Sequence, residues 1–250
     1  MTDQPALPQD ESSSYSTILT NIFAAPSEAF SPIAGTPPRT LRWLIPLVCL
    51  MVLAMGVKYI TATNPTFKGQ IMEIKLAGID RFAEKGWIPP ERAEEEKDKI
   101  RNEDEKPSVL GIVGTGLMPG FMFFVSALFL WIGAKIGLKT PAGYGKHMEI
   151  FGLACWIGII GGIVTMIMMI AFDTMYASPS ASIIVLGSFD PMNTMHRFLS
   201  VLNAFEAWQA VVAGIGIATV AGKGALRGII VSVILWMLWI GVQMSFSLLF

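Results

Sequence analysis

Charged side chains and catalytic motifs are scarce in this chain. Only 15% of its residues are charged, against about 25% in an ordinary globular domain, and none of its basic residues form a tract of the kind that binds nucleic acid. It has two histidines, His147 and His196, and neither belongs to a His-Glu-x-x-His zinc motif. Gly-x-Ser-x-Gly, Cys-x-x-Cys and phosphate-binding glycine motifs are also absent. We therefore expect no catalytic residues, no metal, no cofactor, no nucleic-acid partner and no enzymatic activity.

Long apolar runs dominate the sequence instead. Hydrophobic residues make up 53% of the chain. Five runs each reach the length of about 20 residues that a helix needs to cross a hydrocarbon core of about 30 Å. They cover residues 41–60, 109–138, 151–171, 199–220 and 226–250. The sequence predicts an all-α protein, a polytopic bundle of five transmembrane helices within residues 41–250, with the lipid bilayer as a partner.

The links between the predicted spans give an orientation. Lys and Arg residues in short links tend to stay on the cytoplasmic side. Such residues precede the first span, separate the second from the third and join the fourth to the fifth: Arg39, Arg42, Lys135, Lys139, Lys146, Lys223 and Arg227. The link over residues 172–195 carries two acids and neither Lys nor Arg. We therefore expect a cytoplasmic N-terminus and an extracytoplasmic C-terminus.

Three segments lie outside the spans. Residues 1–16 are polar and are predicted to be a disordered cytoplasmic tail. Residues 17–40 contain an amphipathic stretch that either lies in the membrane interface or docks a partner. In residues 61–108, an extracytoplasmic insert, apolar residues at helical spacing predict a helix that ends near Gly86, and Pro89-Pro90 predicts the start of a second, highly charged helix. We interpret this pair as a solvated hairpin; the alternative is a cation or partner site on its acidic run.

Glycine is concentrated in the predicted spans. Small residues let transmembrane helices approach closely, and van der Waals contact then holds the bundle together. We assign this packing role to four residues: Gly114, Gly158, Gly162 and Gly214. Pro119 is predicted to kink the second span, because proline cannot donate a helical hydrogen bond.

Polar side chains inside the spans are few, and the fourth span holds most of them. Our candidate intramembrane polar site comprises five residues: Asn203, Glu206, Gln209, His196 and Arg197. An acid at the bilayer centre costs about 2.5–3.5 kcal/mol on insertion scales unless it is neutral, paired or hydrated. Glu206 therefore either forms a structural pair with His196, Arg197 or Lys58, or takes part in an ion or proton pathway.

Several short motifs follow one another in a characteristic order along residues 17–249. They are, in chain order, the segment 21–30, then Pro38, Trp43, Leu44 and Pro46, then the segments 89–91, 147–152, 202–208 and 214–216. In this order and spacing the chain resembles the bacterial form of the Yip-domain family, named for interaction with Ypt/Rab GTPases. Relatives often carry Asp in place of Asn203, and Glu206 lies one helical turn further along.

The resemblance implies five spans with a cytoplasmic N-terminus, which agrees with the charge pattern. It also implies a location in the bacterial cytoplasmic (inner) membrane. Eukaryotic members are membrane-trafficking factors that bind small GTPases, whereas bacterial members generally lack an assigned activity. We therefore do not carry small-GTPase binding over to this chain.

Three functions fit these observations. The first is a non-enzymatic scaffold or accessory subunit, whose partners are other membrane protein subunits. The second is a small transporter or ion-conducting bundle that uses Glu206. The third is a trafficking or membrane-shaping factor that acts through the amphipathic residues 17–30.

Overall fold

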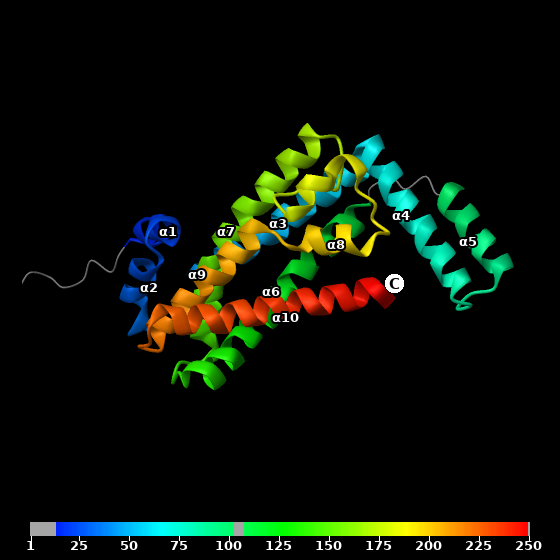
Figure 1. Ribbon diagram of the computed structural model, residues 1–250. Coiled ribbons are helices and arrows are strands. Elements are labelled where there is room, and N and C mark those ends of the chain that lie inside the picture. Colours follow the sequence, from blue (N-terminus) through cyan, green and yellow to red (C-terminus); the bar gives the residue numbers. More distant parts are fainter. Residues whose placement is uncertain (1–13, 103–107, 250) are drawn as a thin grey trace, which may run out of the picture.

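The computed structural model describes residues 14–102 and 108–249, and the regular structure there is helical (Figure 1). Its elements are α1 (Tyr15–Ala24), α2 (Pro26–Ala34), α3 (Leu41–Thr63), α4 (Pro65–Glu84), α5 (Pro90–Asn102), α6 (Val109–Leu138), α7 (Tyr144–Ala171), the 3₁₀ helix η1 (Ala181–Ser188), α8 (Thr194–Val201), α9 (Ala204–Val220) and α10 (Ala225–Leu249). The all-α prediction is confirmed for this part of the chain. Residues 1–13 of the predicted tail lie outside the described residues, and Tyr15 and Ser16, which we predicted to belong to the disordered tail, are part of α1.

Four helices are long and apolar enough to cross a membrane: α3, α6, α7 and α10. The predicted fourth span, residues 199–220, is not one helix. It breaks between α8 and α9, because the Asn203 side chain accepts a hydrogen bond from the Phe205 N–H and so caps a new helix. The remaining apolar helix, α9, has 17 residues. The structure thus supports four spans by length and composition, and the fifth crossing stays a prediction.

The core sits at the end of the bundle where α3, α7 and α10 begin. Its buried residues come from α1, α2, α6, α7 and α9. A smaller aromatic cluster lies between α3, α6 and α7, where Trp43 stacks on Phe123 with ring centroids 6.1 Å apart. Outside these clusters the long helices expose many large apolar side chains, among them Leu117 and Phe121 on α6, as expected of surfaces that face lipid.

The N-terminal helices belong to this core. Ile18, Ile22, Phe30 and Ile33 are at most 1% exposed, and α2 packs along α9 while α1 contacts α7. Both roles that we predicted for residues 17–40, in the interface or on a partner, require a free apolar face. The chain covers these four side chains itself, so they are not free for either role, and the place of the segment at the interface or on a partner stays a prediction.

Glycines bring several helices into close contact. A Cβ at Gly158 would strike the Gln209 side chain, and one at Gly162 would strike Leu53. At Gly214 a Cβ would lie 2.6 Å from a backbone Cα of α10. A side chain at Gly214 would meet the α10 backbone, whereas one at Gly158 or Gly162 would require the flexible end of Gln209 or Leu53 to move. At these positions α7 approaches α3 and α9 closely, and α9 approaches α10 closely.

Two predictions on α6 have different outcomes. A Cβ at Gly114 would meet no atom within 4 Å, so the packing role that we predicted for this glycine is wrong within the described chain. The helix runs unbroken through Pro119, and the kink at that residue stays a prediction.

The hairpin of α4 and α5 lies at the end of the bundle where α3 and α7 finish (Figure 1). Its two helices have the predicted boundaries, because Gly86 adopts a φ of +70° just after α4 and Pro90 begins α5. The Lys97 ammonium bonds Asp80 on α4 and Glu94 on α5, and these hydrogen bonds raise the pKa of Lys97. Arg81 donates to the Met192 carbonyl at 2.8 Å and so joins the hairpin to the segment before α8.

We predict that Phe30→Ala releases the N-terminal helices. Phe30 is fully buried against Gly216 of α9, and removing a buried phenyl ring typically costs about 3–5 kcal/mol. Limited proteolysis in mild detergent should therefore cleave the segment around α1 and α2 faster than in the parent protein. Ser31→Ala, a change at an exposed neighbouring position, is the control and should leave the cleavage rate unchanged. Equal rates for all three proteins would contradict the packing described here.

Candidate functional site

A buried ion cluster joins three helices at the end of the bundle where α3 and α7 begin. Glu149 of α7 is fully buried, and one of its oxygens lies 2.7 Å from the Arg42 guanidinium of α3. Its other oxygen lies 2.5 Å from the Lys146 ammonium, one turn earlier on α7. Lys146 also donates to the Ile33 carbonyl near the end of α2 at 2.9 Å. This ion cluster of Arg42, Lys146 and Glu149 therefore ties α2, α3 and α7 together.

This cluster was not predicted from the sequence. Arg42 and Lys146 were interpreted there as basic residues of cytoplasmic links, whereas both are only 6% exposed. The local signal was the spacing of Lys146 and Glu149, three residues apart and so on neighbouring positions of one helix face. The partner from α3 could not be read from sequence, because it lies 107 residues away from Glu149.

His147 lies beside the cluster in sequence and is also fully buried. Its Nδ1 is 3.0 Å from the Gly143 carbonyl oxygen, which accepts a hydrogen bond from that nitrogen. The Nε2 atom has no hydrogen-bond partner among the described residues. Within that part of the chain there is also no group of three His, Cys, Asp or Glu residues that could hold a metal ion.

The residues of the predicted intramembrane polar site do not form one cluster. Asn203 caps α9 with its side chain. His196, on α8, accepts a hydrogen bond from the Asp190 backbone N–H at its Nδ1 and lies against the Phe189 ring. Arg197 also belongs to α8 and not to the apolar helix. The structure brings together only Glu206 and Gln209, which line one cavity with side chains of α6 and α10.

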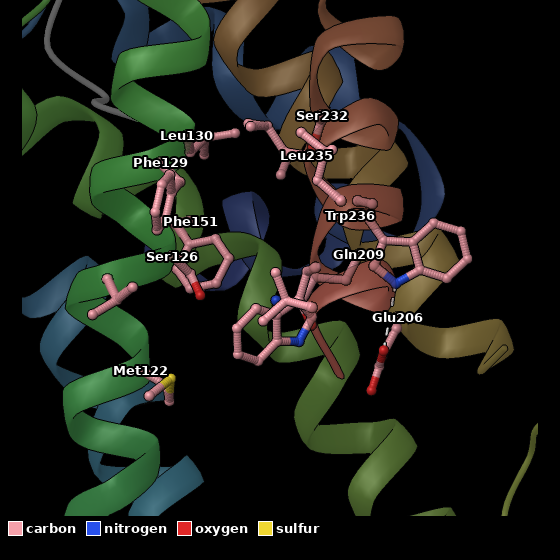
Figure 2. Close-up of a pocket in the computed structure, with 16 residues that line it drawn as sticks. Met122, Ser126, Phe129, Leu130, Phe151, Glu206, Gln209, Ser232, Leu235 and Trp236 are labelled. Atoms are coloured by element: carbon pink, nitrogen blue, oxygen red, sulfur yellow. Dashed lines mark hydrogen bonds between the residues drawn. The ribbon is translucent and has the colours of Figure 1, made fainter. Parts of the chain in front are cut away.

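This cavity, which we call the α6–α10 wedge, has a volume of about 390 Å³ and mostly apolar walls. Met122, Ser126 and Phe129 project from α6 on one side, and Ser232, Leu235 and Trp236 project from α10 on the other (Figure 2). Glu206 and Gln209 of α9 and Phe151 of α7 complete its lining.

The wedge has a closed and an open part. At the closed part α6 touches α10, since a Cβ at Gly133 would lie 2.8 Å from Leu235 and one at Gly137 would lie 2.6 Å from Val231. Beyond this contact the two helices diverge toward the end of the bundle that carries α8 and the hairpin (Figure 1). Leu238, further along α10 in the wedge lining, is 62% exposed. The cavity is therefore open on its lipid-facing side.

Glu206 lies on the wall of the wedge with a neutral partner. Its Oε2 accepts a hydrogen bond of 3.4 Å from the Trp236 indole N–H (Figure 2). No cationic side chain forms an ion pair with it in residues 14–102 and 108–249. The structural pairing of Glu206 with His196, Arg197 or Lys58, which we left open from the sequence, is therefore corrected: the described partner is Trp236 of α10.

Gln209 lies one turn further along α9 and faces α7. Its amide nitrogen is 3.5 Å from the Cys155 sulfur, a weak hydrogen bond, and its Oε1 occupies the space above Gly158. The carboxamide thus bridges the wedge lining and the α7–α9 contact. Sequence spacing correctly placed Gln209 near Glu206, but the sequence did not indicate Trp236 as the second side of the site.

Long apolar helices, side chains exposed to lipid and charges enclosed at one end define a multi-pass integral membrane protein. Residues 20–246 match the sequence model of the Yip1 domain family, so the chain belongs to this family. The resemblance to the Yip-domain family seen in the sequence is thereby confirmed. Neither the comparison with curated proteins nor the comparison with solved structures gave a match.

We predict that Glu149→Gln strongly destabilises the protein. The amide cannot neutralise Arg42 and Lys146, and breaking a buried ion pair by removing one partner typically costs about 3–5 kcal/mol. Thermal unfolding in mild detergent, followed by tryptophan fluorescence, measures the loss.

Glu96→Gln is the matched control for this prediction. Glu96 pairs with Lys99 at the same spacing of three residues and at 2.6 Å, but on the exposed face of α5. Because water and salt screen exposed pairs, this change should leave the unfolding temperature almost unaltered. Equal shifts of the unfolding temperature in the two variants would contradict the stabilising role of the ion cluster.

Proposed function

We propose that this protein is a non-enzymatic scaffold or accessory subunit of a larger membrane assembly, and that the α6–α10 wedge receives a transmembrane helix of its partner. The wedge is the observation that carries the proposal. It is a hollow between spans that elsewhere touch through glycine, and it opens toward lipid.

The lining of the wedge suits a helix from a membrane protein partner. Apolar side chains cover most of it, so a partner helix would gain van der Waals contact along both α6 and α10. Glu206, Ser126 and Ser232 add hydrogen-bonding groups on its wall. Polar side chains in lipid stabilise helix association by about 1–2 kcal/mol in model peptides and by less in measured proteins. A basic or amide side chain on the partner helix would give Glu206 a stronger partner than an indole.

The charges support the orientation in which the ion cluster lies on the cytoplasmic side. Arg42 and Lys146 are buried, so they no longer count as link charges. Five other basic residues remain at that end of the bundle: Arg39, Lys135, Lys139, Lys223 and Arg227. The proposal accordingly places the N-terminus in the cytoplasm and the C-terminus outside a bacterial inner membrane.

Photo-crosslinking in native membranes tests the scaffold proposal. A benzophenone amino acid at Leu238, in the wedge, should give one protein adduct of defined mass. The same probe at Ile167 on α7 is the control, because Ile167 is 58% exposed, almost as much as Leu238, yet does not line the wedge. Mass spectrometry identifies the crosslinked partner. The same partner should remain bound, in mild detergent and at a fixed ratio, to the protein that lacks the benzophenone amino acid. Lipid adducts alone at both positions would remove the basis of this proposal.

The second candidate is an ion-conducting bundle, which is favoured by the polar groups that share the wedge lining, Glu206, Gln209 and Ser232. Purified protein in phospholipid vesicles should then show a proton or potassium flux above empty vesicles. Glu206→Gln should abolish that flux, because it removes the carboxylate, and Glu206→Asp should keep part of it. Vesicles of the parent protein that conduct no more than empty ones would exclude this function.

A further inference from the structure

The segment between α7 and α9 carries features that neither the scaffold proposal nor the ion cluster uses. It comprises residues 172–203 and includes η1 and α8. Between Asp173 and Asp190 it has no charged residue at all. From the sequence alone, residues 172–195 were assigned to an extracytoplasmic link and residues 199–203 to the start of the fourth span. The structure of the segment differs from a solvated loop in three respects.

First, α9 is too short to complete a crossing by itself. Its 17 residues rise about 25 Å at 1.5 Å per residue, against a hydrocarbon core of about 30 Å. With α9 as the fifth crossing in the orientation of the proposed function, on which this inference rests, the chain around Asn203 lies near or inside the outer boundary of the hydrocarbon. Non-helical backbone is tolerated at that depth only where its polar groups are satisfied within the protein.

Second, the backbone at this break is satisfied within the chain. The Ala181 N–H donates to the Leu202 carbonyl at 3.1 Å, and the Ala204 N–H donates to the Pro179 carbonyl at 3.0 Å. These bonds flank the antiparallel bridge between Ser180 and Asn203.

The serine side chains around this bridge are turned inward as well. Ser178, Ser180 and Ser182 form a chain of hydroxyl hydrogen bonds, each 2.8 Å long. Ser180 is only 6% exposed and Ser182 is fully buried. The backbone at the bridge and the hydroxyl groups of Ser178, Ser180 and Ser182 are thus satisfied within the chain.

Third, η1 and one face of α8 present large apolar side chains on the outer surface, whereas the turn between them exposes the polar Asp190 and Asn193. Ile184 of η1 is 77% exposed and Ile183 beside it is 48% exposed. Met195 and Phe198 are exposed on α8, which is amphipathic. This surface is continuous with lipid-facing side chains, because α8 packs against α10, whose Leu238 and Val242 are exposed.

From these observations we propose that η1 and the apolar face of α8 enter the outer leaflet of the bilayer, with lipid as the partner of their exposed apolar side chains and with Asp190 directed toward the headgroups. The segment acts as a re-entrant element that completes the crossing begun by α9. Its satisfied backbone permits this depth, and its isoleucine, methionine and phenylalanine side chains gain burial in lipid.

Site-directed spin labelling tests this proposal. Nitroxide labels are placed at Ile184 and Phe198 in a background of Cys49→Ala and Cys155→Ala, and the protein is reconstituted without partners in vesicles of phosphatidylethanolamine and phosphatidylglycerol. Power saturation then compares collisions with oxygen, which concentrates in lipid, and with a nickel chelate, which stays in water. Leu238 on α10 serves as the lipid reference and Glu94 on α5 as the aqueous reference.

We expect Ile184 and Phe198 to match Leu238, with collisions dominated by oxygen. Values that match Glu94 would overturn the proposal and would leave the apolar face for a protein partner that is absent from these vesicles. Low accessibility to both reagents would also overturn it, since it would mean contact with a second copy of the chain. If the cysteine-free background does not fold, a ketone-bearing amino acid at the same positions carries the label instead.

Discussion

The end of the molecule where α3 and α7 begin depends on the two oxygens of one carboxylate, that of Glu149. They hold Arg42 of α3 and Lys146 of α7, and Lys146 in turn holds the end of α2 through the Ile33 carbonyl. Where water is excluded, two cations and one anion are stable only with full pairing and hydrogen bonding. The position of the N-terminal helices against the spans is therefore fixed by charge as well as by the apolar contacts of Phe30 and Ile33.

Features that depend on local chemistry could be predicted from the sequence. The length of the apolar runs predicted α3, α6, α7 and α10, and Gly86 and Pro90 marked the ends of the hairpin helices correctly. The break before α9 was missed, although an Asn followed three residues later by Glu206 is typical of a helix N-terminus. The apolar run continues through Leu202, so hydropathy alone could not show the break. The break also includes the backbone bridge between Asn203 and Ser180, and this contact joins residues that are far apart in the sequence.

The candidate site shows the same limit. Spacing along one helix placed Glu206 and Gln209 together, and the structure puts both in the wedge. Spacing along the sequence could not identify Trp236 as the partner of Glu206, because the register between α9 and α10 depends on the close contact at Gly214. Likewise, the amphipathic pattern of residues 17–34 was visible, but the surface that covers it was not. Patterns within one element were therefore predictable, whereas contacts between elements were not.

The two glutamates of the spans meet the same physical constraint in opposite ways. An acid away from water must be neutral, paired or hydrated. Glu149 is paired within the chain by two cations and is closed off completely. Glu206 has only an indole N–H at 3.4 Å and lies on the wall of a cavity that opens toward lipid. The end of the bundle with the ion cluster thus pairs its buried charges with its own residues, whereas the end with the wedge leaves a carboxylate and a hollow without a strong partner among the described residues. This asymmetry is the physical reason to look for the protein's partner at the α6–α10 wedge and not at the ion cluster.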